Sequence, residues 1–257
     1  MNIKMIVTDL DDTLLSGKKE ITEYTLTIIR KYQELGIKFV PATARPLSKV
    51  ESFGLPADAL IILNGSRIYQ AGEQIYHKGI SSEELKAFLP TLLKKYADYR
   101  ISVDMEDFFY TNHELSEINP TATQYKICDL LTVPDKITDR ILLTLNDKSE
   151  LKNVQDILPN YLYAHLFDGQ PFCRILHKEV SKAHAISHLC EKWQIDPSEV
   201  VAFGDDYNDI EMFELCGQGV AVENAIAELK AVATDTTSCN NRDGVAKWLE
   251  QKILSWS

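Results

Sequence analysis

The two ends of this chain alternate between strand-like and helix-like segments. Near the start, the apolar stretch 3–8 predicts a buried strand, apolar residues at helical spacing cover 21–35, and 37–40 predicts a second strand. In the last third, a helix over 182–193 precedes a strand over 199–203. Such alternation produces a parallel sheet with helices on both faces. We therefore expect an α/β fold with a doubly wound, Rossmann-like parallel-sheet core.

The middle of the chain breaks this alternation. Ser81 and Glu84 have capping-box spacing and predict a helix through Tyr96, with a kink or break at Pro90. Further strands are expected at 99–103, 108–111, 140–145, 161–166 and 172–176, and further helices at 121–128 and 149–158. This order indicates an inserted α+β domain. We expect residues 1–79 and 180–257 to form the core and 80–179 to form the insert.

The composition argues against several classes of binding partner. The net charge of −11 argues against non-specific binding to nucleic acid or to acidic membranes. It also means that an anionic substrate needs local positive groups or a metal. The five cysteines are odd in number and include no C-x-x-C pair, so neither a disulfide framework nor a zinc cluster is indicated. With no signal peptide and no membrane-length apolar run in view, we expect a cytoplasmic protein.

Polar clusters follow three of the predicted strands. Asp9–Thr13 follows the first strand, Ala42–Arg45 follows the second, and Gly204–Asp209 follows the strand at 199–203. Ligands of open α/β sheets bind beyond the carboxyl ends of the strands, so these clusters are expected at one edge. Lys182 opens a predicted helix, where a cation is unfavourable unless it meets an anion. We therefore expect Lys182 to point into the same cleft.

Together these groups suit phosphoryl transfer, which requires positioning, charge neutralisation and an in-line nucleophile. Asp9 can attack as a carboxylate nucleophile and Asp11 can exchange protons. A carboxylate repels a phosphate, so a cation must lie between them. Mg²⁺ prefers hard oxygen ligands, which Asp9, the backbone carbonyl of Asp11 and Asp205 can supply. The Thr43 hydroxyl, the Lys182 ammonium and loop N–H groups would hold the phosphoryl oxygens.

At this point the chain resembles the haloacid dehalogenase superfamily of aspartate-nucleophile phosphatases, in class IIB and its Cof-like subgroup. Six segments carry the resemblance, in the family's order. They are DLDDTLL at Asp9–Leu15, ATAR at Ala42–Arg45, NGS at Asn64–Ser66, VSKAHAI at Val180–Ile186, GDDYNDIEMF at Gly204–Phe213 and NNRDGVAKWLE at Asn240–Glu250. Any one of them is weak evidence, but the ordered set is specific.

The resemblance implies roles for individual residues. Asp9 would be the nucleophile and a magnesium ligand, and Asp205 a further ligand. Asp11 would protonate the leaving oxygen, deprotonate the hydrolytic water and touch the metal through its carbonyl. Thr13 would fix a carboxylate, and Asp209 would orient Lys182 or a metal-bound water. The implied phosphate- and substrate-binding residues are Leu10, Thr43, Ala44, Arg45, Asn64, Gly65, Lys182 and Asn208.

The expected function is hydrolysis, with Mg²⁺, of a small phosphorylated metabolite such as a sugar phosphate or a phosphorylated cofactor, through an aspartyl-phosphate intermediate. Residues 80–179 would be the cap that selects the substrate. Two alternatives stay open: a phosphomutase with the same nucleophile, and a non-catalytic regulator that binds a phosphorylated ligand. One departure is notable, because Glu223 stands where the family usually has Gly and its charge would oppose phosphate binding.

Two further patterns are expected to be structural. His184 and His188 are four residues apart on a predicted helix, but Ala185 occupies the position of the glutamate in the zinc-protease motif. Packing or surface roles are therefore expected for both histidines. The acidic loop Gly204–Asp209 lacks the remaining positions of a calcium-binding EF-hand, which argues against calcium.

Overall fold

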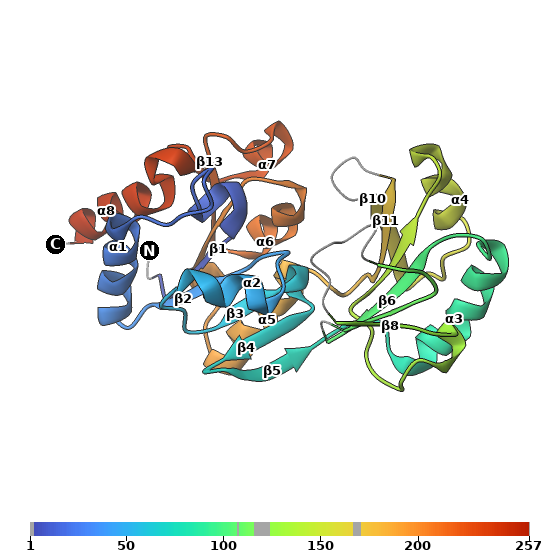
Figure 1. Cartoon of the computed structure of the whole chain (residues 1–257). Coiled ribbons are helices and arrows are strands. Elements are labelled where there is room, and N and C mark those ends of the chain that lie inside the picture. The colour runs from blue at the N-terminus through green and yellow to red at the C-terminus, as the bar shows by residue number, and fades with distance from the viewer. Residues whose placement is uncertain (1–2, 107, 116–123, 167–170, 257) are drawn as a thin grey trace. The chain divides into compact units, whose positions relative to one another are not determined.

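The computed structural model describes residues 3–106, 108–115, 124–166 and 171–256 (Figure 1). The chain divides into two compact units. One unit, called the core unit here, contains Met1–Tyr76 and Ser181–Ser257, and the other, called the inserted unit, contains His77–Val180. In the described part of the chain, no helix has both the length and the apolar character needed to cross a membrane.

The core unit is built on a five-stranded sheet in the order β14-β13-β12-β1-β2, in which all neighbouring strands are parallel. Its strands are β1 (Met5–Thr8), β2 (Lys38–Pro41), β12 (Val200–Gly204), β13 (Gln218–Val222) and β14 (Asp235–Thr237). All residues of β1 and β12 are buried, as expected of parallel strands covered on both faces. Pro41, which has no N–H, ends the edge strand β2.

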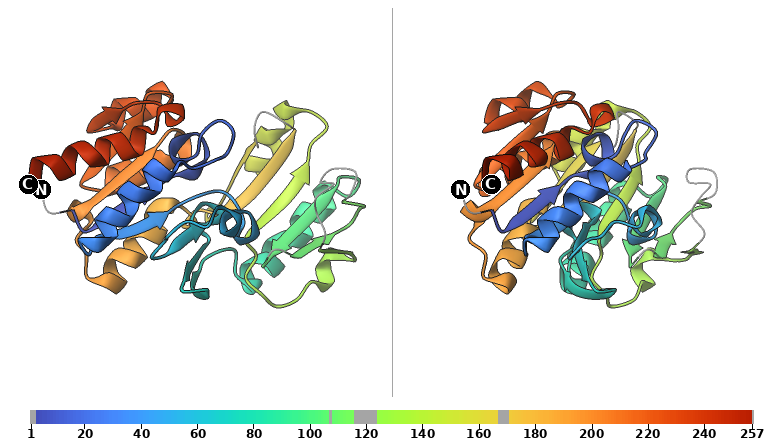
Figure 2. Two further views of the ribbon diagram at one scale, coloured as in Figure 1. Left: turned by 60° about the vertical axis from the view of Figure 1, so that its left-hand side comes forward. Right: turned by 90° about the vertical axis from the view of Figure 1, so that its left-hand side faces the viewer.

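Helices cover both faces of this sheet, which confirms the predicted doubly wound architecture. They are α1 (Glu23–Glu34), α2 (Leu47–Val50), α5 (Lys182–Trp193), α6 (Ile210–Leu215), α7 (Ala227–Val232) and α8 (Gly244–Trp256). Alternate residues of β1 enter different cores. Met5 and Val7 share a core with residues of α5, α6 and α7, whereas Ile6 shares one with α1 and α8. Figure 2 shows α1 and α8 lying side by side.

A small antiparallel sheet completes the core unit. It consists of β3 (Leu60–Ile62), β4 (Arg67–Gln70) and β5 (Glu73–His77), in that order. A single parallel bridge between Ala42 and Ile61 joins β3 to the segment that leaves β2. The loop after β3 is thereby held close to the Thr43 loop.

The inserted unit contains a six-stranded sheet in the order β10-β11-β9-β6-β7-β8, with helices that contribute to a core of its own. Its elements are α3 (Ser82–Lys95), β6 (Ile101–Met105), β7 (Phe108–Thr111), β8 (Tyr125–Ile127), β9 (Arg140–Thr144), α4 (Leu151–Gln155), β10 (Leu162–Leu166) and β11 (Phe172–His177). The predicted capping box at the start of α3 is confirmed. The α+β character expected of the insert is thus present.

Three local predictions in the inserted unit are corrected. The helix expected at 121–128 is wrong over Tyr125–Ile127, which form β8 parallel to β7, and 121–123 lie outside the described residues. Of the kink or break expected at Pro90, the break is absent, because α3 continues from Ser82 to Lys95; the kink stays a prediction. Pro90 lies on the exposed side of α3, where water can bond the carbonyl that loses its partner. The helix expected at 149–158 is shorter: a 3₁₀ turn over Lys148–Glu150 leads into α4.

Candidate active site

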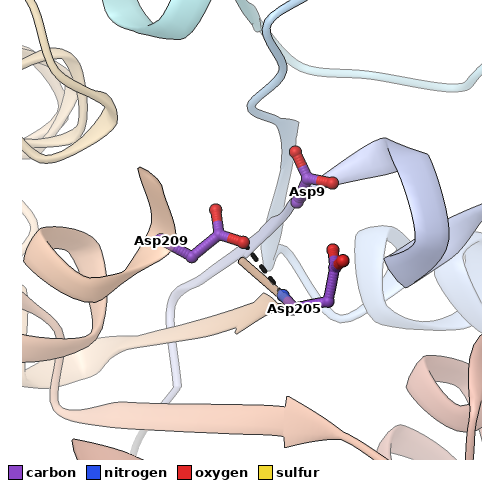
Figure 3. A group of neighbouring side chains, drawn as sticks. All are labelled: Asp9, Asp205 and Asp209. Carbon is purple, nitrogen blue, oxygen red and sulfur yellow. Dashed lines mark hydrogen bonds between the residues drawn. The ribbon is translucent and has the colours of Figure 1, made fainter. Parts of the chain in front are cut away.

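The acidic loop after β1 and the acidic loop after β12 meet at one edge of the sheet. The two strands are adjacent and parallel, with Thr8 opposite Phe203. The backbone N–H of Asp9 donates to the Phe203 carbonyl at 2.9 Å, which fixes the start of the first loop against the end of β12. Asp205 comes directly after Gly204, the last residue of β12. Figure 3 shows the side chains of Asp9, Asp205 and Asp209 gathered at this edge.

Lys182 joins two of these carboxylates. Its Nζ donates to Asp9 Oδ1 at 2.5 Å and to Asp209 Oδ1 at 2.7 Å, and only 1% of the residue is exposed. Lys182 is the first residue of α5, where a cation is favoured only beside anions. Burial would lower the Lys182 pKa, but the charges of Asp209 and Asp9 outweigh burial and raise it. The ammonium therefore stays charged.

Gly65 allows α5 to begin at this place. Gly65 has a φ of +96°, and a Cβ there would lie 2.1 Å from the Ser181 carbonyl oxygen. A side chain at position 65 would therefore push away the residue that precedes Lys182. This packing role is visible in the structure, whereas the predicted contact between Gly65 and substrate stays a prediction.

Asp209 is fixed by the loop that carries it. Its Oδ2 accepts from the backbone N–H group of Asp205 at 2.9 Å (Figure 3). The same oxygen accepts from the Asp206 N–H at 3.1 Å, while Oδ1 accepts from Lys182. A Cβ at Gly204 would lie 2.6 Å from the Asp209 carboxylate, so only glycine leaves room for it. The predicted orienting contact between Asp209 and Lys182 is present.

Asp205 receives a hydrogen bond from Thr13, whose Oγ1 donates to Asp205 Oδ1 at 2.6 Å. The threonine of the first loop thus fixes a carboxylate of the third loop. Burial, together with the charge of Asp209, raises the pKa of Asp205 to about 7 despite this hydrogen bond. Burial likewise raises the pKa of Asp9 to about 8; Lys182 opposes the rise, and Asp209 adds to it.

The three carboxylates fit a hard divalent cation. Asp9, Asp205 and Asp209 each offer an oxygen within 4.8 Å of the others, and among the described residues one buried ammonium, that of Lys182, is bonded to two of them. Both oxygens of Asp209 already accept hydrogen bonds. Within the described residues, the second oxygens of Asp9 and Asp205 do not. Asp9 and Asp205 are therefore the carboxylates best placed to ligate magnesium.

Asp11 carries a bidentate ion pair that sequence reasoning did not anticipate. Arg45 donates through Nε and through a terminal nitrogen to the two Asp11 oxygens, each at 2.6 Å, and Lys19 Nζ lies 2.9 Å from Asp11. Burial alone would raise the pKa of Asp11, but the hydrogen bonds from Arg45 and Lys19 hold it below its ordinary value. Asp11 is thus ionised, and Arg45, predicted to bind substrate, binds this carboxylate.

The second loop presents one hydroxyl. Thr43 is buried, and its Oγ1 accepts from the Arg45 N–H at 3.2 Å, which leaves the hydroxyl hydrogen to be donated. Ala44 lies between these two residues and is half-buried, and Leu10 is buried directly after Asp9. The roles predicted for Leu10 and Ala44, contacts of their N–H groups with phosphate, stay predictions.

Asn64 and Asn208 meet across the site. Asn208 Nδ2 donates to Asn64 Oδ1 at 2.9 Å, which links the third loop to the loop after β3. The Asn64 N–H in turn donates to the Thr43 carbonyl at 2.9 Å. All the residues predicted from the sequence for this site lie in the core unit.

The extra charge of Glu223 is neutralised. Its carboxylate pairs with the guanidinium of Arg242 and accepts from the Cys239 N–H at 3.3 Å. The positive charge of Arg242 therefore offsets the weakening of phosphate binding that was predicted from Glu223. The two histidines have structural contacts, as expected: His184 Nδ1 is paired with Ser181 Oγ at 2.9 Å, and His188 lies with its ring centroid 4.7 Å from that of Tyr76.

Comparisons with known proteins cover nearly the full chain. The family model described as haloacid dehalogenase-like hydrolase matches residues 6–249. The 5-amino-6-(5-phospho-D-ribitylamino)uracil phosphatase YbjI of Escherichia coli is 28% identical, over 99% of this chain and 97% of its own length. YwtE of Bacillus subtilis, which has the same enzyme name, is 27% identical over 98% of each chain. The crystal structure of TM0651 from Thermotoga maritima matches with a TM-score of 0.81 and 27% identity over 97% of both chains.

Proposed function

The chain belongs to the haloacid dehalogenase-like hydrolase family, and we propose that it is a magnesium-dependent phosphatase that hydrolyses a small phosphorylated metabolite through a phosphoaspartate on Asp9. One observation carries the proposal. A buried lysine holds Asp9 and Asp209 beside Asp205, where two parallel strands end. Lys182 is thus placed to steady the nucleophile and to attract the phosphate dianion.

In the first half-reaction, an Asp9 oxygen attacks phosphorus and the bond between phosphorus and the ester oxygen breaks. Asp11 gives its proton to that ester oxygen, which leaves as an alcohol. In the second half-reaction, water attacks the phosphoaspartate, Asp11 takes the proton of the water, and the bond between Asp9 and phosphorus breaks. The Lys182 ammonium and the Thr43 hydroxyl would bind phosphoryl oxygens throughout.

Asp11 is ready for only one of these steps as the structure stands. A carboxylate that accepts two hydrogen bonds from Arg45 and a further contact from Lys19 is the base needed for the second half-reaction. To act as the acid, Asp11 must be protonated, and a protonated oxygen does not pair with a guanidinium. Arg45 must therefore release one Asp11 oxygen before the first half-reaction.

Magnesium would be held by carboxylate oxygens of Asp9 and Asp205 and by the Asp11 carbonyl. When bound, the ion shields the nucleophile from the negative charge of the phosphate. The fit rests on three clustered carboxylates, of which Asp9 and Asp209 share the buried ammonium of Lys182. A matched pair of assays with Mg²⁺ and with EDTA tests this assignment, and full activity in EDTA would contradict it.

We assign substrate selection to residues 80–179, as the cap domain of the family. The compound in the names of the two relatives, 5-amino-6-(5-phospho-D-ribitylamino)uracil, heads the candidates, followed by sugar phosphates and phosphorylated cofactors. The test is a screen of these compounds, with release of inorganic phosphate as the readout. Intramolecular transfer without phosphate release would instead indicate a mutase, and binding without turnover would indicate a regulator.

A further inference from the structure

The motif NNRDG at Asn240–Gly244 is not part of the catalytic group, yet most of its side chains have a partner close to the acidic loop. Asn240 Nδ2 donates to the Leu15 carbonyl at 2.9 Å. Asn241 Oδ1 accepts from the Gly17 N–H at 2.8 Å. Asp243 accepts from the hydroxyls of Thr22 at 2.7 Å and Thr25 at 3.1 Å, at the start of α1. The motif therefore follows the chain that leaves the acidic loop.

The glycine of the motif is required for close approach. A Cβ at Gly244 would lie 1.8 Å from the Ser238 carbonyl oxygen. Arg242 pairs with Glu223, which precedes Asn224 in the loop after β13. These contacts tie the motif to the loop at 223–224, so that the two segments form one support.

Asn224 completes the support from the other side. Its Nδ2 donates to the Asp12 carbonyl at 2.7 Å, and its Oδ1 accepts from the Asn240 N–H at 3.1 Å. Asn224 and Asn240 are thus joined to one another. Together they hold two backbone carbonyls of the acidic loop, those of Asp12 and Leu15, and we call this pair the asparagine clasp.

The clasp acts where the loop is bent most sharply. Between Asp9 and Leu15 the backbone forms a single π-type turn, closed by a hydrogen bond from the Leu15 N–H to the Leu10 carbonyl at 2.8 Å. Within it Asp11 is extended, with ψ of 126°, and Asp12 is left-handed, with φ of +59°. An aspartate in this region is uncommon and needs surrounding contacts to hold it there.

We propose that Asn224 and Asn240 are positioning residues that orient Asp11 by fixing this bend; the proposal rests on the acid–base role given to Asp11 above. The direction of the Asp11 side chain depends on the backbone on both sides of it. On one side Asp9 is fixed by β12, through its N–H bond to Phe203. On the other side the Asp12 carbonyl is fixed by Asn224. Loss of the hydrogen bond from Asn224 would leave Asp9 in place, but the Asp11 side chain would no longer be held in one orientation.

The test uses the first half-reaction, in which Asp11 must donate a proton to the leaving group. Phenolate leaves with more difficulty than 4-nitrophenolate, so phenyl phosphate depends on proton donation by Asp11 more than 4-nitrophenyl phosphate does. Asn224→Asp keeps the acceptor for Asn240 but replaces the donor to Asp12 with a carboxylate oxygen. We expect kcat/KM for phenyl phosphate to fall about tenfold, and that for 4-nitrophenyl phosphate by less than about twofold, since the loss is that of one hydrogen bond.

Asn241→Asp is the matched control. It adds the same charge in the same support, but the Oδ1 that accepts from Gly17 is retained, so the ratio of the two kcat/KM values is expected to stay at the wild-type value. Asn240 is buried, and a carboxylate there would threaten folding. Asn240→Ser, which shortens the donor, is therefore the second variant, and a smaller change of the ratio in the same direction is expected.

Two results would overturn the proposal. One is an equal loss on both substrates, which would mean a smaller fraction of folded enzyme. The other is an unchanged ratio in both Asn224→Asp and Asn240→Ser. Asp11→Asn separates this failure from that of the proposed function. If Asp11→Asn lowers turnover of phenyl phosphate selectively and the clasp variants do not, the acid–base role stands and the clasp is wrong. If Asp11→Asn shows no selectivity, the acid–base role itself fails.

Discussion

Removal of one carboxylate from the cluster should stabilise the protein in the absence of metal. In Asp205→Asn the Oδ1 that accepts from Thr13 is retained, while the other carboxylate oxygen becomes an NH₂ group and the negative charge disappears. Burial raises the pKa of Asp205 from 3.8 to about 7, so folding is opposed by ionisation of this group above pH 7. A difference of about three pKa units corresponds to about 4 kcal/mol as an upper limit. Because Asp205 is partly exposed and its neighbours adjust, we expect a gain of about 2 kcal/mol.

The sign of the pH dependence follows from the raised pKa. Between pH 4 and pH 7 the folded wild-type protein binds more protons at Asp205 than the unfolded chain does, so the contribution of Asp205 to stability falls as the pH rises. The advantage of Asp205→Asn should accordingly be largest at pH 8 and close to zero at pH 4.

The assay is urea denaturation in EDTA, followed by tryptophan fluorescence. All three tryptophans of the sequence belong to the core unit, so the signal reports the unit that contains the site. Addition of Mg²⁺ should make the wild type more stable than Asp205→Asn, the reverse of the order in EDTA. A ligand at a hundred times its Kd stabilises the folded wild type by about 2.7 kcal/mol, and the neutral amide of the variant is a poorer ligand than the carboxylate of Asp205.

Asp98→Asn, which removes an exposed carboxylate from the inserted unit, is the control and should change neither midpoint nor metal response. A variant at position 205 that is no more stable than the wild type in EDTA at pH 8 would refute the reasoning. So would an advantage that is equally large at pH 5.

The same site leads to three further predictions. Asp9→Asn should reduce kcat by on the order of 10⁴-fold or more while the fold is kept, and circular dichroism with a phosphate-release assay checks this. Lys182→Met should lower the free energy of unfolding in EDTA by about 3 kcal/mol, since two buried carboxylates lose their partner; an unchanged urea midpoint would contradict it. Arg45→Lys should slow hydrolysis of the phosphoaspartate about tenfold, because an ammonium does not hold both oxygens of the Asp11 base. An unchanged rate of that second half-reaction in a single-turnover phosphate-release assay would contradict this role of Arg45.

Much of the fold could be predicted because its signals are local. The apolar run before Asp9 and the helical spacing over 21–35 identify a strand and a helix wherever they occur in a chain. The insert was harder to interpret. Tyr125–Ile127 form a strand only because β7 is available to pair with them, and a three-residue segment carries no periodicity of its own.

The residues that the structure gathers at the candidate site could be predicted, but not all of their partners. Asp9, Thr43 and Asp205 each follow a predicted strand, and parallel strands bring such loops to one edge. No comparable rule indicated that Arg45 would form an ion pair with Asp11 or that Thr13 would donate a hydrogen bond to Asp205. The lysine in the loop at position 19 was missed, since a lone surface lysine has no distinguishing spacing.

The amino-acid order alone therefore specifies the succession of strands and helices, the loops that carry chemistry and the kind of chemistry that carboxylates beside a lysine perform. Three features depend on the folded chain: which charged side chains meet, how Asp9 and Asp209 share one ammonium beside Asp205, and how Asn224 and Asn240 come to hold the acidic loop. The physical reason is distance. Secondary structure depends on neighbours a few residues away, whereas these contacts join segments about two hundred residues apart, and only packing brings them within hydrogen-bonding range.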